Sequence, residues 1–223
     1  MTSNKAIYRH ADKALKRLYR YLEAALQRLA STASWDELNV IGAVKQVYNE
    51  SEKRAFDEYL TVAEKAYADA GKEVLALLPN SKDRLKGITA MFIMALLLGY
   101  DPKTQYVYKH EVERKEARLS ESLIAVNQHA DMFNSQETRT ALLRAIRLYE
   151  RQMRNMADTV TDEARIQAFD DAGVEKVTWI TQRDRKVCRI CRERDGQQYS
   201  IRSVPEKHPN CRCFLIPVIP SRD

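Results

Sequence analysis

The sequence has few residues that interrupt helices, with only six glycines and six prolines among 223 residues. Ala, Leu, Glu, Lys and Arg are plentiful instead, and all five favour the α-helix. Hydrophobic residues make up 44% of the chain and charged residues 30%, a balance that excludes a disordered tail. We therefore expect a folded, mainly α-helical protein.

A long apolar run is also missing. The most apolar stretch, residues 88–98 (ITAMFIMALLL), is much shorter than the roughly 20 residues that a transmembrane helix needs. The N-terminal residues show no apolar segment followed by a small-residue cleavage site, so the sequence predicts no secretion signal. We expect a soluble protein, made in a cytoplasm, that has no membrane partner.

The signatures of common enzyme sites are absent as well. The sequence contains no glycine-rich loop of the kind that cradles phosphate and no Ser, His and Asp arrangement typical of hydrolases. His10, His110 and His129 lie in predicted helices without partners at ligand spacing, which favours packing or surface roles. We predict that the protein is not an enzyme, with no catalytic residue and no organic cofactor.

Apolar spacing predicts five helical segments. Four of them cover residues 5–29, 34–78, 88–98 and 103–129. The fifth and clearest begins near Asn134 and ends near Gly173, and its apolar residues alternate at spacings of four and three: Leu142, Ile146, Tyr149, Met153, Met156 and Val160. We expect residues 88–98, which are apolar throughout, to form a buried core helix.

The pattern changes after Gly173. Residues 174–181 (VEKVTWIT) alternate and are rich in β-branched side chains, which is typical of a strand. A second apolar run, residues 214–219, contains Pro217 and is therefore predicted to be an edge strand or an irregular extended segment. We expect the core of this small module to contain Trp179, Val187, Leu215 and Ile216.

These segments predict a mainly α fold, in which an elongated helical body is followed by a small α+β module that resembles a zinc knuckle. Residues 1–133 would form a helical N-terminal region. Residues 134–223 would contain the long helix and the C-terminal module.

All four cysteines lie between positions 188 and 213. Cys188-x-x-Cys191 is followed, after sixteen residues, by His208-Pro-Asn-Cys211-Arg-Cys213. Thiolates and imidazole are the ligands of tetrahedral zinc, and two close pairs separated by a loop are typical of structural zinc sites. The sequence therefore predicts a structural zinc ion here. Five candidates compete for four positions, so either Cys211 or Cys213 could complete the site. If both cysteines bind, His208 lies outside the ligand set.

Other roles for the cysteines fit the sequence less well. Disulfides suit the even count, but a protein without a secretion signal normally meets reducing conditions. A thioredoxin-like Cys-x-x-Cys expects a βαβ context, and haem attachment needs a histidine where Arg192 stands. A Cys–His nucleophile leaves the other cysteines unexplained. An iron–sulfur cluster stays open as an alternative.

The positive charge is concentrated near the C-terminus. From Trp179 to Asp223 there are ten Lys and Arg against five Asp and Glu, a net charge of +5 out of +6 for the whole chain. Such an excess favours contact with a polyanion such as DNA, or simply a solubilising surface. Composition alone leaves both interpretations open.

The order of residues from Thr159 to Val218 resembles the head morphogenesis domain that phage Mu minor head proteins share with their relatives. The matching runs are residues 161–165 (TDEAR), 176–181 (KVTWIT), 184–191 (DRKVCRIC) and, most specifically, 208–213 (HPNCRC). One departure is Arg189, which stands where relatives often have a proline after the first cysteine; it affects the local turn more than metal ligation.

The resemblance implies a minor capsid protein of a tailed phage or prophage that acts in head morphogenesis. Its expected partners are the portal protein, capsid and scaffold proteins, other copies of the chain through its helices, and double-stranded DNA. Its expected place is the virion head at the portal vertex, and the host cytoplasm during assembly. The alternative function is that of a DNA-binding zinc protein acting in packaging or ejection.

Overall fold

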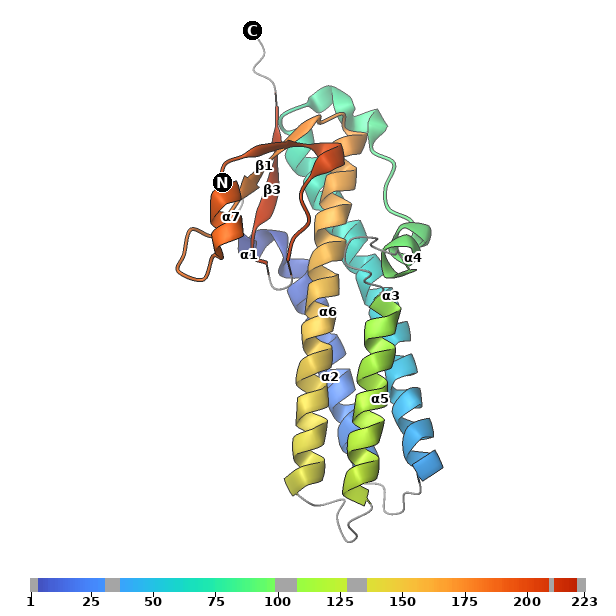
Figure 1. The fold of residues 1–223 in the computed structure, drawn as a ribbon. Coiled ribbons are helices and arrows are strands. Elements are labelled where there is room, and N and C mark those ends of the chain that lie inside the picture. Colours follow the sequence, from blue (N-terminus) through green and yellow to red (C-terminus); the bar gives the residue numbers. More distant parts are fainter. Residues whose placement is uncertain (1–3, 31–36, 99–107, 128–135, 209–210, 220–223) are drawn as a thin grey trace. The chain divides into compact units, whose positions relative to one another are not determined.

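The protein is predominantly helical, as the composition predicts (Figure 1). The computed structural model describes residues 4–30, 37–98, 108–127, 136–208 and 211–219. Within these ranges the helices that precede the C-terminal module are α1 (Asn4–Ile7), α2 (Arg9–Ala30), α3 (Glu37–Leu75), the 3₁₀ helix η1 (Pro79–Arg84), α4 (Ala90–Leu98), α5 (Tyr108–Asn127) and α6 (Gln136–Asp171).

A small antiparallel sheet follows α6. Its strands are β1 (Lys176–Ile180), β2 (Gln198–Ser200) and β3 (Phe214–Val218), in the order β2-β1-β3, and α7 (Arg189–Arg194) and the 3₁₀ helix η2 (Ile201–Ser203) lie between them in the chain. Val177 pairs with Tyr199 on one side and with Pro217 on the other. Pro217 thus lies on an edge strand, where its missing N–H is tolerated, as expected. The sequence did not predict β2 or α7.

The chain divides into two compact units, and neither is continuous in sequence. The first unit contains residues 1–12, 60–89 and 155–223, and the second contains residues 13–59 and 90–154. The predicted boundary between residues 133 and 134 lies outside the described residues. The sheet and all four cysteines belong to the first unit.

The predicted apolar stripe of the long helix is buried. In α6 each of its six residues is at most 8% exposed, and Tyr149, Met153 and Val160 are fully buried. In the second unit Tyr149 packs against Tyr48 of α3, with ring centroids 4.9 Å apart. The Tyr149 hydroxyl donates to Glu52. The spacing of four and three residues therefore identified the correct face of this helix.

The first predicted helix is interrupted at Tyr8, because α1 ends at Ile7 and α2 begins at Arg9. In the sequence Ile7 lies eight positions before Leu15, a spacing that belongs to the apolar stripe of this segment. Ile7 and Tyr8 instead pack against Phe214 of β3, with Ile180 and Ile216 beside them. The N-terminal turn is thus part of the core of the small sheet.

The expected module core is largely present. Trp179 is fully buried, Leu215 is 4% exposed and Val187 is 9% exposed. Ile216 is half-buried. The ring of Trp179 meets the edge of Tyr199, and the Arg194 guanidinium lies 5.1 Å from its centroid. The core that the sequence predicted was too small, because it left out Ile7 and Tyr8.

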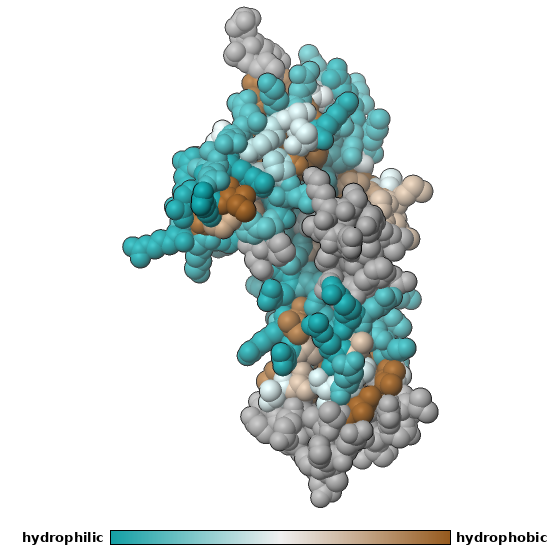
Figure 2. All heavy atoms as spheres, viewed as in Figure 1, coloured by the Kyte–Doolittle hydropathy of each residue, from teal (hydrophilic) through white to brown (hydrophobic). Residues whose placement is uncertain are grey.

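The prediction that residues 88–98 form a buried core helix is wrong. Residues 90–98 do form α4, and Ile93 is buried, but Met91 is 79% exposed and Met94 is 46% exposed. A short helix that is apolar on every side can bury only the side that meets a neighbour. Hydrophilic residues cover most of the visible surface of the described residues, with separate apolar patches (Figure 2). None of the described helices combines the length and the apolarity that a bilayer crossing requires.

Candidate metal centre

The Cys-x-x-Cys pair lies at the start of α7. Cys188 is the N-cap residue, in an extended conformation, and its Sγ accepts the backbone N–H of Cys191 at 3.4 Å. A cap residue commonly accepts an N–H from the first turn in this way, which orients its side chain toward that turn. The spacing of three residues therefore places both sulfur atoms on the same side of the helix start.

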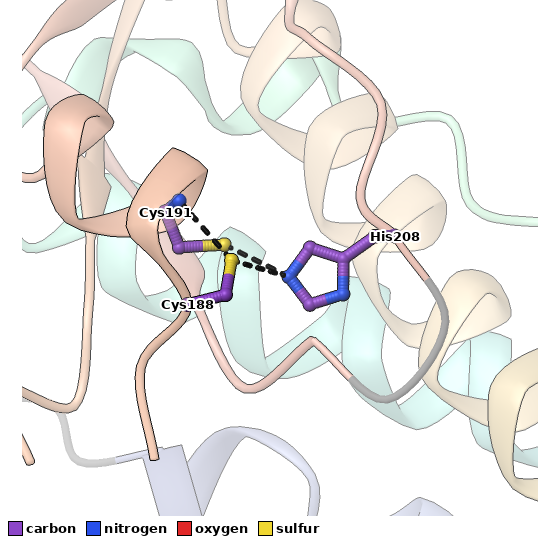
Figure 3. Close-up of side chains that lie close together, drawn as sticks. All are labelled: Cys188, Cys191 and His208. Atoms are coloured by element: carbon purple, nitrogen blue, oxygen red, sulfur yellow. Dashed lines mark hydrogen bonds between the residues drawn. The ribbon is translucent and has the colours of Figure 1, made fainter. Parts of the chain in front are cut away.

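His208 approaches this pair from the loop that precedes β3. Its Nε2 lies 3.1 Å from Cys188 Sγ and 3.1 Å from Cys191 Sγ (Figure 3). Around a tetrahedral zinc ion the ligand atoms lie about 3.5–3.8 Å apart, given bonds of about 2.3 Å to sulfur and 2.0 Å to nitrogen. A small expansion of the group thus makes room for such an ion.

Cys211 and Cys213 complete a second group around Cys191. The Sγ atoms of Cys191 and Cys211 are 3.6 Å apart, and the three sulfur atoms all lie within 4.8 Å of one another. A backbone hydrogen bond links the two groups, because the Cys211 N–H donates to the His208 carbonyl oxygen at 3.0 Å. The structure therefore gathers all five predicted ligands into two groups that share Cys191, and these residues could hold a metal ion.

The cysteines are not paired as disulfides. All four are free thiols, and the Cys191–Cys211 distance is far longer than the S–S bond of about 2.05 Å. The disulfide alternative therefore does not describe this structure. Free thiols held together in a partly buried cluster are suited to binding a soft or borderline cation.

The neighbouring groups separate the pKa values of the thiols. The hydrogen bond from Cys213, aided by the charge of Lys207, lowers the pKa of Cys211 to about 5. The hydrogen bond to Cys211 and burial raise the pKa of Cys213. Burial raises the pKa of Cys191 to about 12, and the N–H of Cys191 lowers that of Cys188. The thiols with raised pKa values thus keep their protons, and a divalent ion would displace these protons on binding.

The cluster opens into a small surface hollow, through which an ion could enter. Its lining consists of Gln182, Lys186, Val187, Cys188, Cys191, His208, Arg212 and Cys213. At this face Arg212 makes a two-pronged ion pair with Asp184, with N–O distances of 2.8 and 2.6 Å. Cys213 lines the hollow, whereas the short sulfur–sulfur contact involves Cys211, so the geometry keeps both as candidates for the fourth ligand.

The turn after α7 holds the cysteine pair against the sheet. Gly196 has φ of +79°, a conformation that glycine adopts readily, and its N–H donates to the Trp179 carbonyl oxygen at 2.8 Å. The Asp195 carboxylate accepts the Thr181 N–H at 2.8 Å and Arg183 Nε at 2.9 Å. Asp195-Gly196 was the signal in the sequence from which this turn could have been predicted.

The sequence did not predict that Tyr8 and Lys207 both contact the carbonyl oxygen of Cys213, or that Asp162 accepts hydrogen bonds from both of them. Tyr8 and Cys213 are 205 positions apart, and no local pattern links them. His10, by contrast, is part-buried, and its Nε2 lies 2.9 Å from Asp69 Oδ2. His129 lies outside the described residues.

Comparison of the chain with models of known protein families, with curated proteins and with solved structures gives no match. The resemblance to phage head proteins therefore rests on the motif residues themselves.

Removal of one ligand is expected to remove the metal. Cys188→Ala should reduce zinc bound per chain to less than a tenth, because the three remaining ligands of the set hold the ion poorly. It should also remove about 4 kcal/mol of stability when free zinc is about 1,000 times the dissociation constant of the wild-type protein. Elemental analysis and thermal unfolding measure the two effects. Ile190→Ala, an exposed change between the two cysteines, is the control and should retain the metal.

The fourth ligand can be identified with cobalt. The charge-transfer absorption from sulfur to metal is stronger for Co²⁺ bound by three thiolates and one imidazole than for Co²⁺ bound by two thiolates. We expect either Cys211→Ala or Cys213→Ala to lower this absorption by about a third, and the other variant to leave it unchanged. An equal loss in both variants would instead indicate that both thiolates bind and that His208 lies outside the ligand set.

Proposed function

We propose that this protein is a minor structural protein of a phage or prophage head, which assembles at the portal vertex and contains a structural zinc ion in its C-terminal module. One observation carries the proposal. The residues of the most specific motif, His208, Cys211 and Cys213, meet the Cys188–Cys191 pair in space. The motif behind the resemblance is therefore also the part of the module that could bind metal.

The donor atoms favour zinc over other common ions. Thiolates and imidazole suit zinc, whereas magnesium and calcium prefer oxygen ligands. An iron–sulfur cluster is commonly held by four cysteines, but here an imidazole nitrogen lies 3.1 Å from two of the sulfur atoms. A mixed sulfur and nitrogen set around one tetrahedral ion accounts best for this arrangement.

A structural role for the ion follows from the number of ligands. Catalytic zinc sites keep one position open for water or substrate, whereas structural sites are closed by four protein ligands. Five candidate side chains are available here, enough to close the sphere. The ion would then join the start of α7 to the loop before β3, adding stability to a sheet of three short strands with a small core.

The assembly role can be tested with the portal protein encoded by the same phage or prophage. The chain should co-sediment with portal rings and with procapsids, in the presence or absence of DNA. Cys188→Ala should reduce the bound amount several-fold, because the module loses its shape, and Ile190→Ala should bind like wild type. The proposal would be contradicted if portal rings and procapsids assembled in the presence of the protein but sedimented without it.

The basic surface of the module supports a second candidate function, that of a DNA-binding zinc protein. Arg185, Lys186 and Arg202 are exposed. Three other arginines near the metal centre are paired with acids: Arg183 with Asp195, Arg189 with Glu193, and Arg212 with Asp184. In these pairs three guanidinium groups are already engaged by carboxylates, which leaves fewer of them to contact phosphate groups and favours the structural role over DNA binding.

We therefore expect weak binding to duplex DNA. Fluorescence anisotropy with a short labelled duplex should give a dissociation constant no tighter than the non-specific range of about 10⁻⁴–10⁻⁶ M at physiological salt. Binding in the nanomolar range that weakens steeply between about 50 and 200 mM salt, and that Arg185→Ala reduces, would instead favour the DNA-binding alternative.

A further inference from the structure

The Lys207 ammonium is largely buried and faces three oxygen atoms. Its Nζ donates to Asp162 Oδ2 at 2.6 Å, to the Cys213 carbonyl oxygen at 2.6 Å and to the Tyr8 hydroxyl oxygen at 2.9 Å. The side chain of Lys207 is 17% exposed and that of Asp162 is 10% exposed. Because an ammonium has three N–H groups, each of them has one acceptor here.

Tyr8 closes the network from the N-terminal turn. Its hydroxyl donates to Asp162 Oδ1 at 2.7 Å, and the Cys213 carbonyl oxygen lies 3.0 Å away as a second acceptor. Its ring packs beside Phe214, the residue that follows Cys213. Three segments distant in sequence, the N-terminal turn, α6 and the loop before β3, are therefore joined in one hydrogen-bond network.

The network holds the candidate metal ligands by their backbone. Lys207 directly precedes His208, and the carbonyl group that Lys207 and Tyr8 contact belongs to Cys213. If the loop moved away from α6, the buried charges of Lys207 and Asp162 would lose their partners, which is strongly unfavourable. The loop is thus restrained on both sides of the segment that carries three of the five candidate ligands.

We propose that Lys207, Asp162 and Tyr8 are positioning residues of the metal centre, which hold the loop from His208 to Cys213 so that its ligands converge on Cys188 and Cys191. This inference rests on the metal centre proposed above. Groups outside the ligand set of a metal commonly change its affinity by about 10- to 100-fold when they are removed.

A nearby ion pair provides a matched control. Arg165 lies on the same helix, α6, one turn beyond Asp162, and is 5% exposed. Its NH2 group donates to Glu73 Oε2 at 2.9 Å and lies 3.5 Å from the Leu215 carbonyl oxygen. This pair is also part-buried and lies in the first unit, but no candidate metal ligand takes part in it. Arg165→Met should therefore destabilise the fold without a specific effect on the metal.

The test compares Lys207→Met, Tyr8→Phe and Arg165→Met in the full chain. Zinc affinity is measured by competition with a chromophoric chelator, thermal stability by circular dichroism, and ligand geometry by the absorption spectrum at saturating Co²⁺. We expect Lys207→Met to weaken zinc binding about 10- to 100-fold and to change the Co²⁺ spectrum. Tyr8→Phe, which removes one hydroxyl group, should weaken zinc binding several-fold. Arg165→Met should lower the melting temperature but keep affinity within about twofold and the spectrum unchanged.

The outcomes separate this inference from the metal assignment. If the wild-type protein binds no zinc, the metal centre itself is wrong and the inference falls with it. If the wild type binds zinc but Lys207→Met binds it within twofold as tightly, or if Arg165→Met loses as much affinity as Lys207→Met, the positioning role is refuted while the metal centre stands. Should Lys207→Met fail to fold, Tyr8→Phe decides, and wild-type affinity in that variant refutes the inference.

Discussion

The first unit depends on the meeting of four thiols and one imidazole in one small region. Sulfur atoms this close cannot all ionise without a cation, which is why burial and mutual hydrogen bonds move their pKa values in opposite directions. A divalent ion would remove this conflict, because it would take the place of the shared protons. The same ion would join α7 to the loop before β3, two segments between which β2 and η2 lie in the chain.

The rest of the unit provides the frame for that cluster. The sheet has only three short strands, and its core extends to Ile7 and Tyr8 in the N-terminal turn. The last part of α6 contributes Asp162 and Arg165, which form buried ion pairs with Lys207 and Glu73. The module that contains the candidate metal ligands is therefore not an independent C-terminal domain, since chain segments from three separate regions build one compact unit.

The distribution of charge bears on how such a module would be used. The C-terminal excess of positive charge is large in the sequence, but several arginines near the cysteines are paired with nearby carboxylates in the structure. Paired surface charges interact less strongly with a polyanion than the same number of unpaired ones. This balance supports the structural role that we propose over the DNA-binding alternative.

The sequence by itself determined the helical character, the buried stripe of α6, the strands at residues 176–180 and 214–218 and the identity of the candidate ligands. These features depend on spacing between near neighbours, which the chain displays directly. Only the tertiary structure decided that α4 leaves Met91 exposed, that the first helix breaks at Tyr8, and that Tyr8, Asp162 and Lys207 meet beside Cys213. Such contacts join residues far apart in the chain, where neither helical nor strand periodicity carries information about which segments meet.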